Sequence, residues 1–199
     1  MSTFTLAYGR PTLADRVFSR RLVTDVILVA AGAGLTSLMA QIAIPLWPVP
    51  LTMQTFAVLF VGATLGPIRG ALSMALYLVL GVVGLPVFSG AASGSLFALP
   101  SGGYVVGFVF AAALVGWLAQ REWDRRWLRT GVSFLLGSAV MYVFGLPWLY
   151  VSLVGLHVPN ALSVTLTSGF TVFIVGDILK AVLAGVLLPL AWRGLGSKK

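Results

Sequence analysis

The segment "TLTSGFTVFIVGDILKAVLAGVLLPLAW", residues 165–192, is a long apolar run interrupted by one acid and one base, Asp177 and Lys180. A helix needs about 20 residues to cross the hydrocarbon core of a bilayer, and this run is long enough. Hydrophobic residues make up 59% of the 199 residues, charged residues make up 9%, and the mean hydropathy is +1.01. These values exclude a soluble globular domain and predict an integral membrane protein.

Similar apolar segments, separated by short loops, fill the rest of the chain. They are continuous runs of Val, Leu, Ala and Gly without the alternation of barrel strands, so we expect an all-α integral membrane protein. Between 52 and 84, two short helices are expected because Gly66 can end one and Pro67 can begin the next. The single expected domain, 1–199, has a polar segment at 1–21 and six transmembrane helices at 22–44, 52–66, 67–84, 102–120, 130–155 and 165–192.

The basic residues predict the orientation, because Lys and Arg in short loops collect on the cytoplasmic side. With six helices and cytoplasmic N- and C-termini, all 13 basic residues except Lys180 lie on that side. A single helix over 52–84 would instead place the arginines of 121–129 outside. The cytoplasmic residues are Arg10, Arg16, Arg20, Arg21, Arg69, Arg121, Arg125, Arg126, Arg129, Arg193, Lys198 and Lys199.

These loops account for the net charge of +8, so no nucleic-acid partner is expected. Their expected partners are anionic membrane lipids. The loops expected outside, 45–51, 85–101 and 156–163, contain no charged residue apart from the titratable His157. Because they are apolar and aromatic, we expect them to fold over a cavity. For Trp47 and Trp148, anchoring at the bilayer interface is the alternative.

Asp177 and Lys180 are the only charged residues well inside an expected span. A charge at a helix centre costs about 2.5–3.5 kcal/mol on insertion scales unless it meets a partner or a wet cavity. Residues three apart share a helix face, so the pair is expected to face the bundle interior. A self-neutralising pair that serves only packing is the alternative, although a buried ion pair adds little net stability. An acceptor beside a donor favours a site for a small solute with N–H groups and a carbonyl or carboxylate.

Residues for catalysis or metal binding are scarce. The chain has no cysteine, one histidine and five acidic residues, which excludes thiolate nucleophiles and disfavours metal sites. It also lacks a Gly-Lys-Ser/Thr phosphate loop, so it cannot hydrolyse ATP by that route. We therefore expect no enzyme, no metal site and no cofactor. A membrane enzyme that uses Asp177 and Lys180 for proton chemistry is the alternative of that class.

Five motifs carry a family resemblance. They are "PVPLTMQT" at 48–55, "LGPIRGALS" at 65–73, "GLPVF" at 84–88, "LPSGGYVVGF" at 99–108 and "GDILKA" at 176–181. With them the chain resembles the BioY family, the biotin-capturing S components of energy-coupling-factor (ECF) transporters. The resemblance extends from about residue 22 to the last helix. One departure is Ser101, where the family usually has Thr, and this change keeps the hydroxyl.

The resemblance implies a six-helix, multi-pass protein of the bacterial cell (inner) membrane that captures biotin from the outer side. In the family, the Asp and Lys of the last-helix motif bind biotin, which implies the same role for Asp177 and Lys180. Lys180 would serve either the ureido carbonyl or the carboxylate. The further substrate-binding candidates are Thr52, Gln54, Phe88, Ser89, Ser93, Ser101 and Tyr104. For the polar residues among them, ordinary loop or helix-cap hydrogen bonding is the alternative role. For Phe88, the alternative is a lipid-facing or core position.

The resemblance also implies partners, namely a transmembrane coupling subunit driven by two cytoplasmic ATPases. Ala30 and Gly34, in "AAGAGLTS" at 30–37, are small residues four apart, which lets another helix approach closely. In the family, small residues of this helix dock the coupling subunit; packing within the bundle is the alternative. A solitary biotin transporter and an S component for a different vitamin are the alternative functions.

Overall fold

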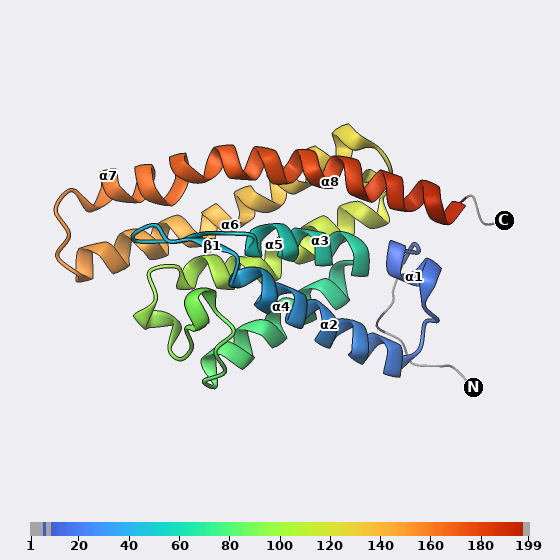
Figure 1. Ribbon diagram of the computed structural model, residues 1–199, viewed down its shortest axis with the longest axis horizontal. Helices are drawn as coiled ribbons and strands as arrows, with labels where there is room; N and C mark the ends of the chain where they lie inside the picture. The colour runs from blue at the N-terminus through green and yellow to red at the C-terminus, as the bar shows by residue number, and fades with distance from the viewer. Residues whose placement is uncertain (1–5, 7–8, 197–199) are drawn as a thin grey trace.

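The computed structural model describes residues 6 and 9–196 and is an elongated bundle of helices (Figure 1). Lys198 and Lys199, which the sequence assigns to the cytoplasmic side, lie outside the described residues. The helices are α1 (Leu13–Val17), α2 (Leu22–Ala40), α3 (Gln54–Leu65), α4 (Pro67–Val82), α5 (Gly102–Gln120), α6 (Trp127–Gly155), α7 (Ala161–Leu166) and α8 (Val172–Gly196). Shorter elements are the strands β1 (Ala43–Ile44) and β2 (Leu51–Thr52), the 3-10 turns η1 (Ser89–Ala91), η2 (Leu96–Ala98) and η3 (Trp123–Arg125), and one π-helical turn, η4 (Thr167–Thr171).

Four helical stretches are long and apolar enough to cross a membrane by length and composition. These are Leu22–Ala40, Gly102–Gln120, Trp127–Gly155 and Ala161–Leu195. The last includes α7, η4 and α8, which run together along one side of the bundle beside α6 (Figure 1). Helix α5 packs against α3, α4 and α6 and forms the centre of the bundle.

The first expected span, 22–44, is wrong at its C-terminal end. Helix α2 ends at Ala40, and residues 43–44 pair as an antiparallel strand with residues 51–52. The prolines of "PLWPVP" (45–50) lie between the paired strands, where a helix would lose backbone hydrogen bonds. Expected bounds also differ at the other end of the chain, because α6 begins at Trp127 and the last helical stretch begins at Ala161.

The predicted break between two short helices is present. Helix α3 ends at Leu65. Gly66 follows it with a φ of 90°, which glycine adopts readily, and Pro67 begins α4. Helix α3 has 12 residues, about 18 Å at 1.5 Å per residue, which is shorter than a bilayer core. Close packing against α5 holds α3 in place. The two backbones approach so closely that a Cβ added to Gly62 would lie 2.5 Å from the Ala112 carbonyl oxygen of α5.

Arg69, which the sequence analysis counts with the loop charges, is buried in the first turn of α4 and only 2% exposed. Its Nε donates to Asp25 Oδ1 at 2.7 Å, and a terminal nitrogen donates to Asp15 Oδ1 at 2.8 Å. Burial raises the pKa of Asp15, but hydrogen bonds from Thr12, Arg69 and Arg20 outweigh it, and the net pKa is lowered. This Asp15–Arg69–Asp25 cluster joins α1, α2 and α4.

Another buried acid, Asp124 in η3, has incomplete hydrogen bonding. One carboxylate oxygen accepts from Trp192 Nε1 at 2.5 Å, and the other is buried without a partner among the described residues. Burial raises the pKa of Asp124 from 3.8 to about 6. The folded protein therefore prefers the protonated form, whereas the unfolded chain ionises near its ordinary pKa.

We expect the melting temperature in detergent to rise as the pH falls from 7.5 to 5, and Asp124→Asn to remove this rise. Because the folded pKa of Asp124 is raised, its stabilising contribution is present at low pH and lost as the pH rises through about 6. The gain between these pH values is about 1 kcal/mol. Asp15 does not oppose it, because its pKa is lowered and its contribution is lost only in more acidic solution. An unchanged pH dependence in the Asn variant would contradict the assignment.

Candidate ligand-binding site

Asp177 and Lys180 lie one turn apart on α8 and face the bundle, 7% and 8% exposed. Asp177 Oδ1 and Lys180 Nζ are 3.7 Å apart. Each charge also has a neutral partner on another helix. Tyr142 of α6 donates to Asp177 Oδ2 at 2.6 Å, and Lys180 Nζ donates to Thr55 Oγ1 of α3 at 2.7 Å. The pair therefore connects α8 with α3 and α6, which are distant from it in sequence.

The two charges keep hydrogen-bonding capacity beyond these contacts. A carboxylate has about four lone-pair sites, and Asp177 meets only Tyr142 and Lys180 in the described part of the chain. An ammonium has three donors, and Lys180 Nζ has two partners: Thr55 Oγ1 at 2.7 Å and the Asp177 carboxylate at 3.7 Å, near the upper limit for an ion pair. The arrangement can thus receive a solute that presents donors to Asp177 and an acceptor to Lys180.

Aromatic side chains wall the pair on the side of α5 and η4. The Tyr142 ring packs edge-on against Phe170 at 5.0 Å and against Tyr104 at 6.3 Å between ring centroids. Tyr104, a sequence candidate, donates its hydroxyl to the Gly169 carbonyl at 2.8 Å. Gly169 lies in the π-helical turn, a departure from the α-helix that is frequent at functional sites.

Thr52, Gln54 and Phe88 form a second cluster, joined through Tyr77. Gln54 Nε2 donates to the Tyr77 hydroxyl at 2.6 Å, and the Tyr77 ring packs edge-on against Phe88 at 5.5 Å. Thr52 Oγ1 accepts from the Gln54 backbone N–H at 3.2 Å, which is the local hydrogen bonding named above as its alternative. Phe88 is buried in the core, so the lipid-facing alternative is wrong.

The structure does not bring the three serine candidates to the pair. Ser89 lies in η1, Ser93 is exposed in the loop after it, and Ser101 precedes α5. Their hydroxyls make no hydrogen bond within residues 6 and 9–196. Over the same residues, no group of three or more His, Cys, Asp or Glu forms that could hold a metal ion.

A hollow with a volume of about 360 Å³ lies between the β1–β2 hairpin and α8. Thr52, Met53 and Lys180 line it together with apolar residues such as Leu179 and Leu183. Its size falls within the range of small-molecule pockets. Lys180 therefore belongs both to the buried pair and to the lining of a hollow large enough for a small ligand.

The small residues of α2 divide between two faces. Gly32 and Ala33 are buried, and a Cβ on Gly32 would lie 2.5 Å from Ser73 Oγ, so these two pack within the bundle. Ala30 and Gly34 are exposed, and no atom lies within 4 Å of a Cβ built on Gly34. Ala30 also lines an apolar groove of about 410 Å³ between α2 and α4.

Two site residues, Thr55 and Tyr142, were not predicted from the sequence. Thr55 ends the quoted "PVPLTMQT" motif, which is the signal that could have found it. Tyr142 has no such signal, because its neighbours in α6 form an ordinary apolar run. Its role depends on the fold, which brings it to a residue 35 positions away.

Comparisons with known proteins agree with this architecture. The BioY family model matches residues 11–197. A protein named biotin transporter BioY from Rhizobium etli is 36% identical over 174 residues, which cover 82% of this chain and 90% of the relative. A probable biotin transporter BioY from Pyrococcus horikoshii is 38% identical over 164 residues, covering 82% and 93%.

Among solved structures, the S component for biotin of an ECF-type ABC transporter matches with a TM-score of 0.71. It is 28% identical, and the match covers 86% of this chain and 92% of that one. The relatives are named as transporters rather than enzymes, and with the four apolar helices they make this a multi-pass membrane protein. The chain belongs to the BioY family.

Proposed function

We propose that this protein takes up biotin as the substrate-capture S component of an ECF transporter, binding the vitamin from the outer side of the membrane. The observation that carries the proposal is the buried Asp177–Lys180 pair, which has unused hydrogen-bonding capacity beside a hollow. The names of the relatives and of the structural match specify biotin as the ligand.

Biotin suits the pair chemically. Its ureido ring has two N–H donors and one carbonyl, and its side chain ends in a carboxylate. In the proposed complex, Asp177 accepts from a ureido N–H, and Lys180 donates to the ureido carbonyl or to the carboxylate. Hydrogen bonds to charged groups contribute about 1.5–3 kcal/mol, and burial excludes competing water. Thr52, Gln54, Phe88, Ser89, Ser93, Ser101 and Tyr104 complete the proposed pocket and its cover.

The proposed topology has six transmembrane helices, formed as one domain over 1–199, with both termini in the cytoplasm of a bacterial cell. Contacts of two arginines near the N-terminus support the placement of both termini on the same side. Arg10 bonds Glu122 at 3.4 Å, and the Arg16 guanidinium lies 5.9 Å from the Trp192 ring, so the N-terminal segment, η3 and the end of α8 meet. Figure 1 shows α1 and the C-terminal end of α8 at the same end of the bundle.

Equilibrium binding of labelled biotin to the purified protein in detergent tests the function. We expect saturable binding of one biotin per chain, displaced by unlabelled biotin and not by other vitamins. Preferential displacement by another vitamin would identify an S component with a different ligand. Absence of saturable binding would contradict the proposal. Uptake in cells that lack the coupling subunit would identify a solitary transporter.

The exposed small residues of α2 are the proposed docking face for the coupling subunit, which in turn binds two ATPases. We expect Ala30→Trp and Gly34→Trp each to reduce copurification with the coupling subunit at least tenfold, because the indole prevents close approach of a helix. Biotin binding should be unchanged. Ala139→Trp, on an exposed position of α6, is the matched control. Unaltered copurification of both α2 variants would contradict the docking face.

A further inference from the structure

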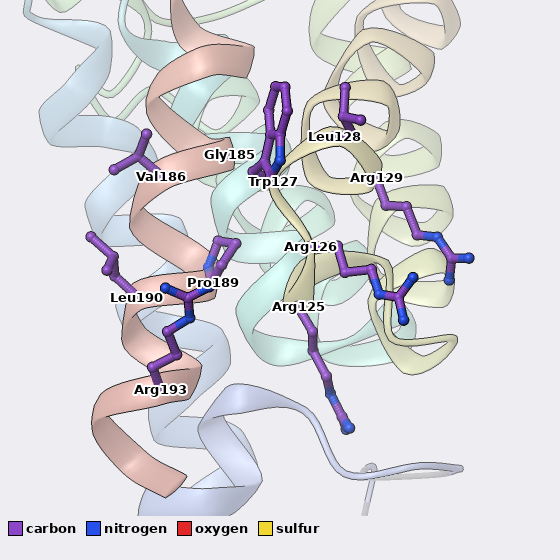
Figure 2. Close-up of a pocket in the computed structure, with 10 residues that line it drawn as sticks. All are labelled: Arg125, Arg126, Trp127, Leu128, Arg129, Gly185, Val186, Pro189, Leu190 and Arg193. Atoms are coloured by element: carbon purple, nitrogen blue, oxygen red, sulfur yellow. The ribbon is translucent and has the colours of Figure 1, made fainter. Parts of the chain in front are cut away.

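A groove of about 520 Å³ lies where the start of α6 meets the C-terminal half of α8 (Figure 2). Four arginines line it: Arg125 and Arg126 just before α6, Arg129 in the first turn of α6, and Arg193 on α8. Figure 2 shows the Arg126 and Arg129 side chains on the α6 side and the Arg193 side chain running back along α8 to Pro189. Four positive charges around one hollow attract an anion.

The acids of the chain do not supply that anion. Arg125 is matched by Glu122 at 3.1 Å and lies over the Trp192 ring at 4.5 Å. Arg126, Arg129 and Arg193 contact no carboxylate in the described part of the chain. All five acidic residues lie in that part; Glu122 pairs with Arg125, and the other four have partners outside the groove. The five acids are Asp15, Asp25, Glu122, Asp124 and Asp177.

The groove has an apolar half as well as a basic one. Trp127, 68% exposed, lies at the start of α6, and its indole rises between the two helices in Figure 2. Val186 and Leu190 of α8 are exposed and also line the groove. The helices touch at the back of the groove, where a Cβ on Gly185 would lie 3.0 Å from the Trp127 carbonyl oxygen. A soluble phosphate compound would leave these apolar surfaces uncovered, whereas an acyl chain would cover them.

We propose that this groove binds one anionic phospholipid. Its phosphate binds at the basic end of the groove, where the long side chains of Arg126, Arg129 and Arg193 can turn toward it from the directions in Figure 2. One acyl chain lies along Trp127, Val186 and Leu190. The positive end of the α6 dipole, at its N-terminus, adds to the attraction. Tryptophan is typical of the level where head groups meet chains, and basic grooves between membrane helices suit acidic head groups. The inference does not depend on which vitamin the protein carries.

Native mass spectrometry of the detergent-purified, full-length protein with dioleoyl phosphatidylglycerol tests this, with dioleoyl phosphatidylcholine as the neutral reference. We expect one retained phosphatidylglycerol per chain and no comparable retention of phosphatidylcholine. The groove variant is Arg126→Gln/Arg129→Gln/Arg193→Gln. Each arginine contributes about fivefold in affinity, so its affinity should fall roughly 100-fold. The matched control is Arg16→Gln/Arg21→Gln/Arg121→Gln, which removes the same charge from exposed residues outside the groove and should retain the lipid.

Equal loss of lipid in the groove and control variants would overturn the proposal, because it would mean diffuse attraction by net charge. Displacement of the lipid by glycerol 3-phosphate at equal concentration would also overturn it, because the site would then bind a soluble anion. Unchanged melting temperatures of both variants show that the folded state is compared. If the groove variant is unstable, Val186→Trp, which fills the groove without changing charge, should lower lipid retention, and full retention by it would count against the site.

Discussion

Asp177→Asn and Lys180→Met are each expected to weaken biotin binding about 30- to 150-fold, which corresponds to about 2–3 kcal/mol. Either change removes a charged hydrogen bond to the ligand and leaves the opposite charge buried without its 3.7 Å partner. Isothermal titration or labelled-biotin binding in detergent measures the effect. Asp124→Asn, the same change in a buried acid of η3, should leave affinity unchanged.

The double variant Asp177→Asn/Lys180→Met separates the two explanations of the pair. If the charges serve only each other, removing both restores stability and leaves biotin binding as in the parent. If they bind the vitamin, the double variant is stable in the membrane yet fails to bind. Tyr142→Phe and Thr55→Val should have smaller effects, because these residues orient the charges through hydrogen bonds of 2.6 and 2.7 Å. Parental affinity in either single charge variant would contradict the pocket.

Arg69→Met is expected to destabilise the protein by about 3–5 kcal/mol, the largest effect on folding that we predict. The substitution removes the guanidinium that two buried carboxylates share, Asp15 at 2.8 Å and Asp25 at 2.7 Å. The remaining partners, such as Arg20 for Asp15 and the Leu6 backbone N–H for Asp25, do not replace a contact with a buried charge. The melting temperature in detergent and the yield of monodisperse protein should both fall. Arg21→Met, at an exposed arginine, is the control and should change neither.

Rescue distinguishes this mechanism from a packing defect. Adding Asp15→Asn and Asp25→Asn to Arg69→Met removes the buried negative charges that Arg69 balanced and should recover much of the lost stability. Biotin affinity of the rescued protein should equal that of the parent, because the Asp177–Lys180 pair contacts the start of α3 whereas Arg69 lies beyond its end. The helix between them is about 18 Å long. A triple variant as unstable as Arg69→Met would contradict the account.

Local sequence signals predicted the parts of the fold that local chemistry determines. The expected span 102–120 has the bounds of α5, and the expected break at Gly66 and Pro67 separates α3 from α4. The hairpin of β1 and β2 was missed because residues 43–44 are as apolar as the helix before them. Only the prolines that follow argue against a longer helix.

Tertiary contacts explain what sequence could not predict about the charged groups. Arg69 follows the short loop between two helices, which is where cytoplasmic charges collect, yet its partners lie 44 and 54 residues away. Thr55 and Tyr142 meet the Asp177–Lys180 pair across 125 and 35 residues. The inward-facing pair itself was predictable, because charge in an apolar span has few tolerable environments. Its role in binding stays a prediction.

A density map of the biotin-loaded protein tests the central claim most directly. The account predicts a ureido N–H within about 3 Å of an Asp177 carboxylate oxygen, with the Lys180 ammonium in contact with the ureido carbonyl or the carboxylate of the ligand. Biotin bound elsewhere, with Asp177 and Lys180 still meeting only each other, Tyr142 and Thr55, would contradict it.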